Sequence, residues 1–180
     1  MTSLARNIFA PTAAKPPHPM DIGPAARTGV MLLAGGLLIA TMIALVRGLT
    51  GLAPQHPNSR EIAIVIHVAT VLPAIPLGAW LLLAGKGGAL HKLLGKIWIA
   101  LMLTTASSAI FIQTGGSVSL IHLFVPLTFW VSYKVVATAR RGDIKAHRSE
   151  ILGLYFGALG IPGLVALVLP GRLLNTWLFW

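Results

Sequence analysis

The feature that most constrains this chain is a series of five long apolar runs separated by short connections. Each run is close to the roughly 20 residues that an α-helix needs to cross about 30 Å of hydrocarbon, and the runs cover residues 28–46, 62–84, 93–112, 117–139 and 151–169. Backbone groups in lipid must pair internally, and these runs do not alternate as the strands of a membrane barrel do. The sequence therefore predicts an all-α integral membrane bundle of about five transmembrane helices.

The composition agrees with a membrane protein and excludes several other classes. Of the 180 residues, 56% are hydrophobic and 10% are charged, which is too little polar surface for a soluble domain of this size. The chain contains no cysteine, which excludes disulfides, thiolate metal sites and thioether-linked haem. The net charge is +10, but the basic residues gather in the connections beside the apolar runs. That pattern is typical of membrane topology rather than of a phosphate-binding surface, so we expect a lipid bilayer and no nucleic acid as partner.

The positions of Lys and Arg predict the orientation of the chain in the bilayer. All 14 of them except Arg47, Arg60 and Arg172 fall on the side of the N-terminal segment and of the second and fourth connections. Because cytoplasmic loops are enriched in Lys and Arg, we expect a multi-pass protein of the bacterial inner (cytoplasmic) membrane with its N-terminus in the cytoplasm. The C-terminus is then outside, with Trp177 and Trp180 in the outer interface.

The same distribution divides the chain into a tail and a membrane domain. Residues 1–27 are interrupted by several prolines, so we expect an irregular, Pro-rich cytoplasmic tail. The transmembrane helical domain follows over residues 28–180. The first apolar run is longer than the roughly 7–15 residues of a secretory h-region, and we therefore expect no cleaved signal peptide.

Four histidines lie near the starts of four different apolar runs. Because successive helices alternate in direction, His67 and His122 fall at one membrane face, and His91 and His147 fall at the other. Ionisable residues within a membrane are functional candidates by default. The residues on the same helix face as His67 are small, which leaves room either for a flat ligand or for close helix packing; they are Ala63, Thr70, Ala74 and Gly78.

Haem b is the cofactor that this arrangement of histidines favours. Neutral imidazole nitrogens bind iron axially, and a helix bundle offers a dry slot between facing helices. We therefore predict that His67 with His122, and less strongly His91 with His147, bind haem iron in a membrane electron-transfer protein, with a quinone as candidate redox partner. The alternative for the histidines is simpler: hydrogen bonds between helices, with the pair at the basic side contacting lipid headgroups.

A cofactor-free accessory subunit of a larger respiratory or photosynthetic membrane complex is the competing hypothesis for function. The last apolar run has a smooth glycine face at Gly153, Gly157, Gly160 and Gly163, suited to an internal contact or to docking on another subunit. No carboxylate lies within the apolar runs, so a proton pump is poorly supported. No hydrolase, nucleotide-binding or metalloprotease motif is present, and whether the chain is an enzyme stays open.

The positions of the other polar residues predict simpler roles. His56 lies among prolines in the first connection and is expected to be solvated, and Arg172 is expected to meet headgroups or cap the last helix. The hydroxyls of Thr105 and Ser108 are expected to bond to carbonyls of their own helix or to a neighbouring helix.

The chain from His67 to about residue 179 resembles a family of small bacterial membrane proteins, the domain of unknown function DUF2306. The resemblance is carried by HVATVLPAIPLGAWLLLAGKGGALHKLLGK, the IHL that contains His122, ARRGDIKAHR, and GLYFGALGIPGLVALVLPGRLLNTWLF. It implies a multi-helix membrane protein with histidines at these four positions, and it implies no particular reaction. The chain has HRSEI at residues 147–151 where the family often has HRRxM, so Glu150 is not carried over as a shared functional group.

Overall fold

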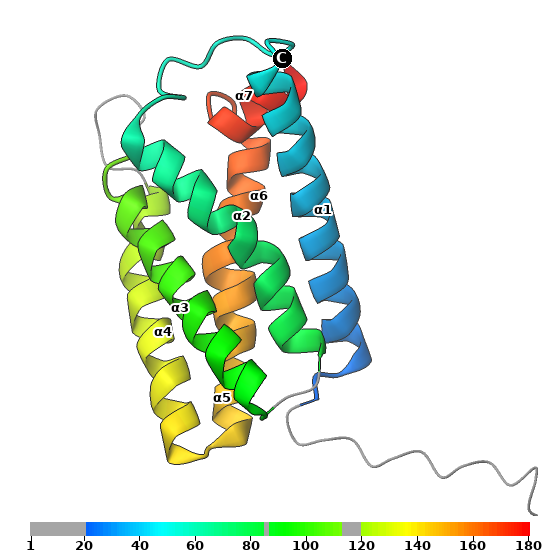
Figure 1. Cartoon of the computed structure of the whole chain (residues 1–180), viewed down its shortest axis with the longest axis vertical. Helices are drawn as coiled ribbons and strands as arrows, with labels where there is room; N and C mark the ends of the chain where they lie inside the picture. The colour runs from blue at the N-terminus through cyan, green and yellow to red at the C-terminus, as the bar shows by residue number, and fades with distance from the viewer. Residues whose placement is uncertain (1–20, 85–86, 113–119) are drawn as a thin grey trace, which may run out of the picture.

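The protein folds into a bundle of antiparallel helices, as the computed structural model shows for residues 21–84, 87–112 and 120–180 (Figure 1). The described residues contain five helical spans long and apolar enough to cross a membrane. The helices in chain order are α1 (Pro24–Leu49), α2 (Ile62–Leu83), α3 (Ala89–Ala109), the 3-10 turn η2 (Leu120–Leu123), α4 (Phe124–Arg141), α5 (Ile144–Gly153), the π-helix η3 (Leu154–Gly160), α6 (Ile161–Val168) and α7 (Leu173–Phe179). The predicted all-α bundle of about five membrane helices is therefore confirmed.

The fifth span begins earlier than hydropathy predicts, because a polar cap starts it. The chain leaves α4 through Gly142, whose φ of 71° is in the left-handed region that favours glycine. The Asp143 side chain then accepts a hydrogen bond from the amide of Ala146 at 3.0 Å, which is an N-cap. The polar residues after Ile144 are thus already helical, and α5, η3 and α6 continue as one span to Val168.

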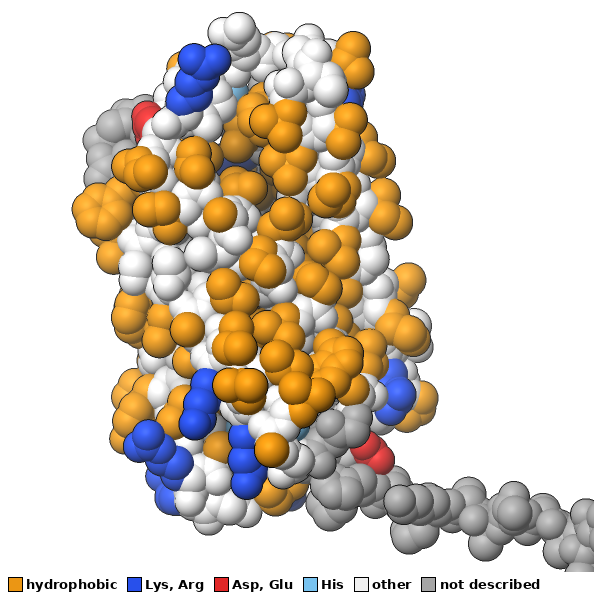
Figure 2. All heavy atoms as spheres, viewed as in Figure 1, with side chains coloured by type: hydrophobic (Ala, Val, Ile, Leu, Met, Phe, Trp, Pro, Cys, Tyr) orange, Lys and Arg blue, Asp and Glu red, His pale blue; other side chains and the backbone are white. Residues whose placement is uncertain are grey.

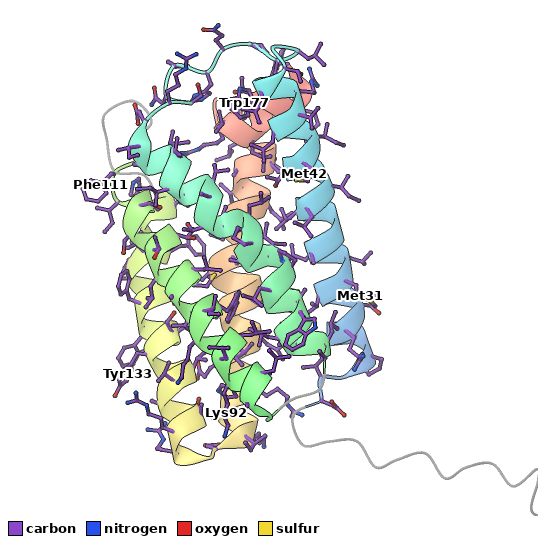
Figure 3. All side chains as sticks on the ribbon, in the orientation of Figure 1. Met31, Met42, Lys92, Phe111, Tyr133 and Trp177 are labelled. Atoms are coloured by element: carbon purple, nitrogen blue, oxygen red, sulfur yellow. The ribbon has the colours of Figure 1, made fainter. Side chains whose placement is uncertain are left out.

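The outer surface of the bundle is apolar over most of its length. Hydrophobic side chains cover the middle of the face seen in Figure 2, and Met31, Phe111 and Tyr133 point away from the helices in Figure 3. Leu32 is 71% exposed and Phe111 is 70% exposed. Such a surface suits hydrocarbon rather than water, and it agrees with a protein that crosses a membrane several times.

Charged side chains gather at one end of the bundle, here called the basic end. It is formed by the start of α1, the end of α2, the start of α3 and the turn between α4 and α5, and Lys and Arg side chains cluster there in Figure 2. Lys134 of α4 pairs with Glu150 of α5, with the Nζ and Oε1 atoms 2.5 Å apart. Residues 21 and 180 lie at opposite ends of the bundle (Figure 1). Which end faces the cytoplasm stays a prediction.

The centre of the bundle is held by two aromatic residues that bond to the backbone of α2. Trp98 donates its indole Nε1–H to the carbonyl of Ala74 at 2.9 Å, and Tyr155 donates its hydroxyl to the carbonyl of Ile75 at 3.2 Å. Both side chains are almost fully buried. A Cβ atom at Gly78 would lie 2.7 Å from Trp98 Nε1 and 2.8 Å from the Tyr155 ring, so glycine is required for this approach. The small residues of α2 at this level therefore serve close helix packing.

Part of the glycine face of the fifth span, at Gly160 and Gly163, is an internal contact, whereas a Cβ atom at Gly153 or Gly157 would meet no heavy atom within 4 Å. A Cβ at Gly160 would meet Leu33 at 2.7 Å, and one at Gly163 would meet Leu37 at 3.0 Å. Leu33 and Leu37 belong to α1. Of the two roles that the sequence allowed for these glycines, packing within the chain is the one observed at Gly160 and Gly163.

The C-terminal helix α7 turns back against α1, which the sequence analysis did not predict. Arg47 of α1 donates to the carbonyls of Leu178 and Trp180. Gly48 faces the indole ring of Trp177 so closely that a Cβ atom there would overlap it. The last residues of the chain are thereby fixed across the end of the bundle opposite the basic end.

Candidate functional site

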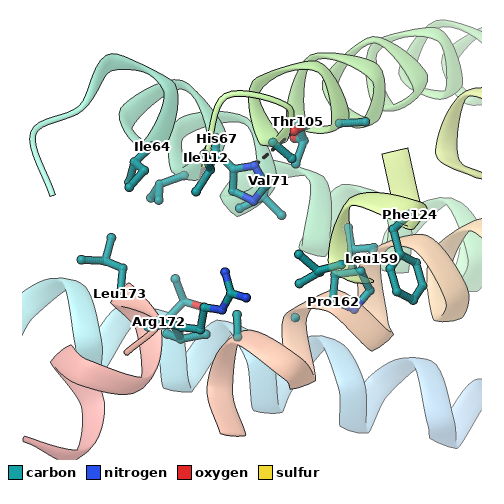
Figure 4. Close-up of a pocket in the computed structure, with 18 of the residues that line it drawn as sticks. Ile64, His67, Val71, Thr105, Ile112, Phe124, Leu159, Pro162, Arg172 and Leu173 are labelled. Carbon is teal, nitrogen blue, oxygen red and sulfur yellow. Dashed lines mark hydrogen bonds between the residues drawn. The ribbon is translucent and has the colours of Figure 1, made fainter. Parts of the chain in front are cut away.

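A mostly apolar cavity of about 250 Å³ lies in the half of the bundle away from the basic end. It is bounded by α1, α2, α3, α4, the η3–α6 part of the fifth span, and the segment that leads into α7 (Figure 4). Most of its wall consists of aliphatic and aromatic side chains such as Val71, Met102 and Phe124. All five spans therefore contribute to one cavity, and its few polar groups come from separate elements.

His67 lines this cavity and is fixed by a hydrogen bond to α3. Its Nδ1 atom lies 3.1 Å from the carbonyl oxygen of Thr105 and 3.2 Å from the hydroxyl of Ser108. The carbonyl can only accept, and the Ser108 hydroxyl already donates to the same carbonyl at 2.8 Å. Nδ1 must therefore carry the proton, and in the neutral ring the lone pair is on Nε2. Neither bond uses Nε2, which is the nitrogen directed toward the cavity in Figure 4.

The hydroxyl groups around His67 join α2 to α3. Thr70 and Thr105 share a hydrogen bond of 2.8 Å between their Oγ1 atoms. Ser107 and Ser108 bond to the carbonyls of Leu103 and Thr105 in their own helix. The prediction for the Thr105 and Ser108 hydroxyls is confirmed. Together with His67 they form a polar group that a membrane interior tolerates because its members bond to one another.

His122 lines the same cavity from η2, at the start of the fourth span. Helix α4, which follows η2, packs on α3, and α3 packs extensively on α2. The two histidines that the sequence paired are thus placed on the wall of one cavity by two different spans. Whether they share a ligand stays a prediction.

His91 and His147 lie at the basic end and do not line this cavity. Both side chains are buried, at 9% and 8% exposure, so they are not the headgroup contacts that the simpler hypothesis assumed. His147 Nδ1 lies 3.0 Å from the carbonyl oxygen of Val135 in α4. Its Nδ1 therefore carries the proton, as in His67, and Nε2 holds the lone pair of the neutral ring.

Two further polar residues line the cavity that sequence reasoning placed elsewhere. The guanidinium of Arg172 points into it from the wall facing His67 (Figure 4). His56 also lines it, and its Nε2 lies 3.3 Å from the carbonyl oxygen of Gly171. The C-terminus of α6 is instead capped by Asn175, whose Nδ2 donates to the carbonyl of Leu167 at 2.8 Å. Arg172 is therefore a residue of the cavity wall, not a cap of the last membrane helix.

Arg172 and His56 reach the cavity because of a turn after α6, which the hydropathy pattern does not predict. Gly171 has a φ of 78°, and the turn it allows after Pro170 returns the chain over the cavity before α7 begins. The PGR sequence was a visible signal of that turn. Its consequence for Arg172 and His56 depends on contacts between residues more than a hundred positions apart.

Within the described ranges, no group of three or more His, Asp or Glu side chains is arranged to hold a metal ion. The model of a family described as predicted membrane proteins, DUF2306, matches residues 64–173. That range contains His67, His91, His122, His147 and Arg172. No curated protein matches the chain. No solved structure matches it either.

Proposed function

The chain belongs to the DUF2306 family of predicted membrane proteins, and we propose that it binds b-type haem between His67 and His122 and transfers electrons in the membrane. One observation carries the proposal. His67 donates its Nδ1–H to a backbone carbonyl, which leaves the lone pair on Nε2. This nitrogen faces a cavity that His122 also lines.

The donor chemistry of the cavity fits haem iron. Histidines that bind metals generally donate their second ring nitrogen to a carbonyl, carboxylate or water, which fixes the tautomer and the ring plane. The carbonyl of Thr105 has this role for His67. When bound, haem supplies a one-electron couple whose potential depends on its axial ligands and on burial. Here His67 and His122 are the proposed ligands, and most of the wall around them is apolar.

The size of the cavity sets a condition on this proposal. Its volume of about 250 Å³ is below the roughly 300–1,000 Å³ typical of small-molecule sites. A ligand as large as haem therefore requires side chains of the wall to change rotamer. Met102 and Leu37 line the cavity, and flexible side chains of this kind, methionine above all, adapt to a ligand at modest cost.

The second histidine pair extends the proposal across the membrane. His147 has the same Nδ1–H bond to a neighbouring helix as His67, and His91 is buried at the same end of the bundle. We propose that His91 and His147 hold a second haem at the basic end, which faces the cytoplasm of a bacterium. If haem were bound by both pairs, His67 with His122 and His91 with His147 would hold it in opposite halves of the bilayer, where it would supply one-electron chemistry toward a redox partner such as a quinone.

The test is an optical spectrum of the purified protein after expression with an adequate haem supply. We expect a Soret band and a reduced α-band in the wild type. His67→Ala and His122→Ala should each remove the same part of the spectrum, and His91→Ala and His147→Ala should each remove the other part. His18→Ala is the control, a histidine outside the proposed ligand set, and should retain both. A colourless wild type, or full haem content in His67→Ala, contradicts the proposal.

A cofactor-free accessory subunit of a larger respiratory or photosynthetic complex is the second candidate. The observation in its favour is an exposed aromatic surface on α4. There the ring centroids of Trp130 and Tyr133 are 6.0 Å apart, and Phe129 lies beside them. Native separation after mild detergent extraction distinguishes the two functions. A colourless protein that migrates with a large complex supports the accessory role, and a coloured protein that migrates alone supports electron transfer.

A further inference from the structure

We propose that the outward face of α4 binds an anionic phospholipid of the bilayer, with the phosphate at Arg140 and Arg141 and an acyl chain on Trp130 and Tyr133. The proposed electron transfer gives this face no role, and lipid binding here does not depend on haem binding in the cavity. One end of the face is aromatic and the other is cationic, and the partner is identified by the chemistry that matches both ends.

Four residues form this face, because spacings of three, four and three residues place side chains along one side of a helix; they are Trp130, Tyr133, Ala137 and Arg140. Trp130 is 61% exposed and Tyr133 is 65% exposed, and Arg140 and the adjacent Arg141 are also exposed. The buried residues of α4 lie on the opposite side of the helix; they are Thr128, Ser132, Val135 and Thr138. The outward face therefore points away from the bundle and toward lipid.

The aromatic part of the face suits an acyl chain close to the membrane surface. The rings of Trp130 and Tyr133 lie side by side, and both residues line an open surface groove with Pro126 and Phe129. Tyr133 points outward from α4 in Figure 3. Trp and Tyr have an apolar ring with one polar group, and they are enriched where hydrocarbon meets headgroups. The groove therefore offers apolar contact for the chain and hydrogen-bond donors for the ester region.

The cationic part of the face suits a phosphate. Arg140 and Arg141 end α4, and α4 contains no Asp or Glu. The third cation of the helix, Lys134, is paired with Glu150 of α5. A guanidinium forms two parallel hydrogen bonds to a phosphate, which gives the contact both strength and orientation. The two arginines are therefore the groups of α4 that recognise an anionic headgroup.

The separation of the two parts matches a phospholipid rather than a small anion. Tyr133 and Arg141 are eight residues apart in α4, which is about 12 Å along a helix axis. Ala137 lies between them, and its small side chain leaves space beside the helix. A phosphate at the arginines then places the glycerol esters beside Ala137 and the first methylenes on the aromatic rings. A free phosphate would contact only the arginines, and a neutral apolar surface of another protein would contact only the rings.

The experiment places the protein in phosphatidylcholine vesicles that contain a minor fraction of lipid with brominated acyl chains, either phosphatidylglycerol or phosphatidylcholine. Bromine quenches tryptophan fluorescence on contact, and the signal of Trp130 is the difference between wild type and Trp130→Phe. We expect brominated phosphatidylglycerol to bind at Trp130 roughly five- to thirty-fold more strongly than brominated phosphatidylcholine, since each Arg near an anionic lipid contributes about five-fold. High salt should weaken this preference.

Replacement of both arginines, by Arg140→Gln with Arg141→Gln, should bring the preference close to one. Both brominated lipids should then quench Trp130 equally, because the aromatic contact remains. The matched control is Lys92→Gln with Lys145→Gln, which removes the same charge from exposed residues of α3 and α5 at the basic end. The control should keep the wild-type preference.

Three results overturn the proposal. Equal quenching of the wild type by the two brominated lipids means that the face does not select an anionic headgroup. A preference that survives loss of both arginines, or that falls equally in the lysine control, means that the arginines do not bind the headgroup. Absence of quenching at Trp130 by either lipid means that a second copy or a copurified protein covers the face. If a variant does not fold, the wild-type comparison still decides. The haem content of the same wild-type sample tests the proposed function separately.

Discussion

The Nδ1 atom of His67 lies 3.1 Å from the carbonyl oxygen of Thr105, and this bond determines which nitrogen of the ring can bind a ligand. An imidazole has two nitrogens, so a structural bond and a ligand bond do not compete in one histidine. The two hypotheses that the sequence left open, an interhelical hydrogen bond and a cofactor ligand, therefore apply to different atoms of His67.

The Thr105 carbonyl, rather than the Ser108 hydroxyl, should orient the His67 ring. Ser108→Ala removes the 3.2 Å contact and leaves the 3.1 Å bond to the carbonyl. We expect haem content equal to wild type and a loss in unfolding free energy of about 0.6 kcal/mol, the average for hydrogen bonds between membrane helices. Haem content and unfolding in mixed micelles measure the two effects. Loss of haem in Ser108→Ala shows that the hydroxyl is the essential partner.

Gly78→Ala should destabilise the bundle by about 1–3 kcal/mol, which is the usual cost of overpacking a core. The added Cβ atom would lie 2.7 Å from Trp98 Nε1 and 2.8 Å from the Tyr155 ring. Both rings are buried and bonded to α2 carbonyls, so neither moves away cheaply. Gly95→Ala is the control, because no heavy atom lies within 4 Å of a Cβ there. Equal stability of the two variants in mixed micelles contradicts this account of the core.

Arg47 should hold the C-terminal helix against α1. Arg47→Gln removes the donors to the carbonyls of Leu178 and Trp180, and we expect amide hydrogen exchange over residues 173–180 to rise at least several-fold. Arg60→Gln should leave that exchange unchanged, since Arg60 lies in the connection between α1 and α2. Unaltered exchange in Arg47→Gln means that packing of Trp177 on Gly48 is sufficient to hold α7.

The orientation in the membrane is testable because the chain has no cysteine of its own. Ser59→Cys places a thiol at the end opposite the basic end, and Lys145→Cys places one at the basic end. We predict that the basic end faces the cytoplasm, because cytoplasmic loops are enriched in Lys and Arg. An impermeant thiol reagent added to intact cells should therefore label Ser59→Cys and not Lys145→Cys. The reverse pattern overturns the orientation.

The bundle could be predicted from the sequence because each membrane span has to satisfy its own backbone and bury no charge, and both requirements are visible as long apolar runs. The placement of His67 and His122 at the same end of the bundle could be predicted because successive helices alternate in direction. The role of Arg172 could not be predicted in this way. It depends on how α7 returns over the cavity, which is set by contacts of Arg47 and Gly48 with residues 177–180. Hydropathy and short motifs depend on residues that are near in sequence, so they do not predict contacts between residues this far apart.

Low-temperature electron paramagnetic resonance of the ferric protein tests the central claim most directly, because it reports how many strong axial ligands the iron has. If His67 and His122 both bind through a ring nitrogen, the wild type shows a low-spin signal of bis-imidazole haem. With the two histidines at the basic end removed by His91→Ala and His147→Ala, further replacement of His67 or of His122 should convert the remaining signal to high-spin. A low-spin signal that survives His67→Ala in that background contradicts the account.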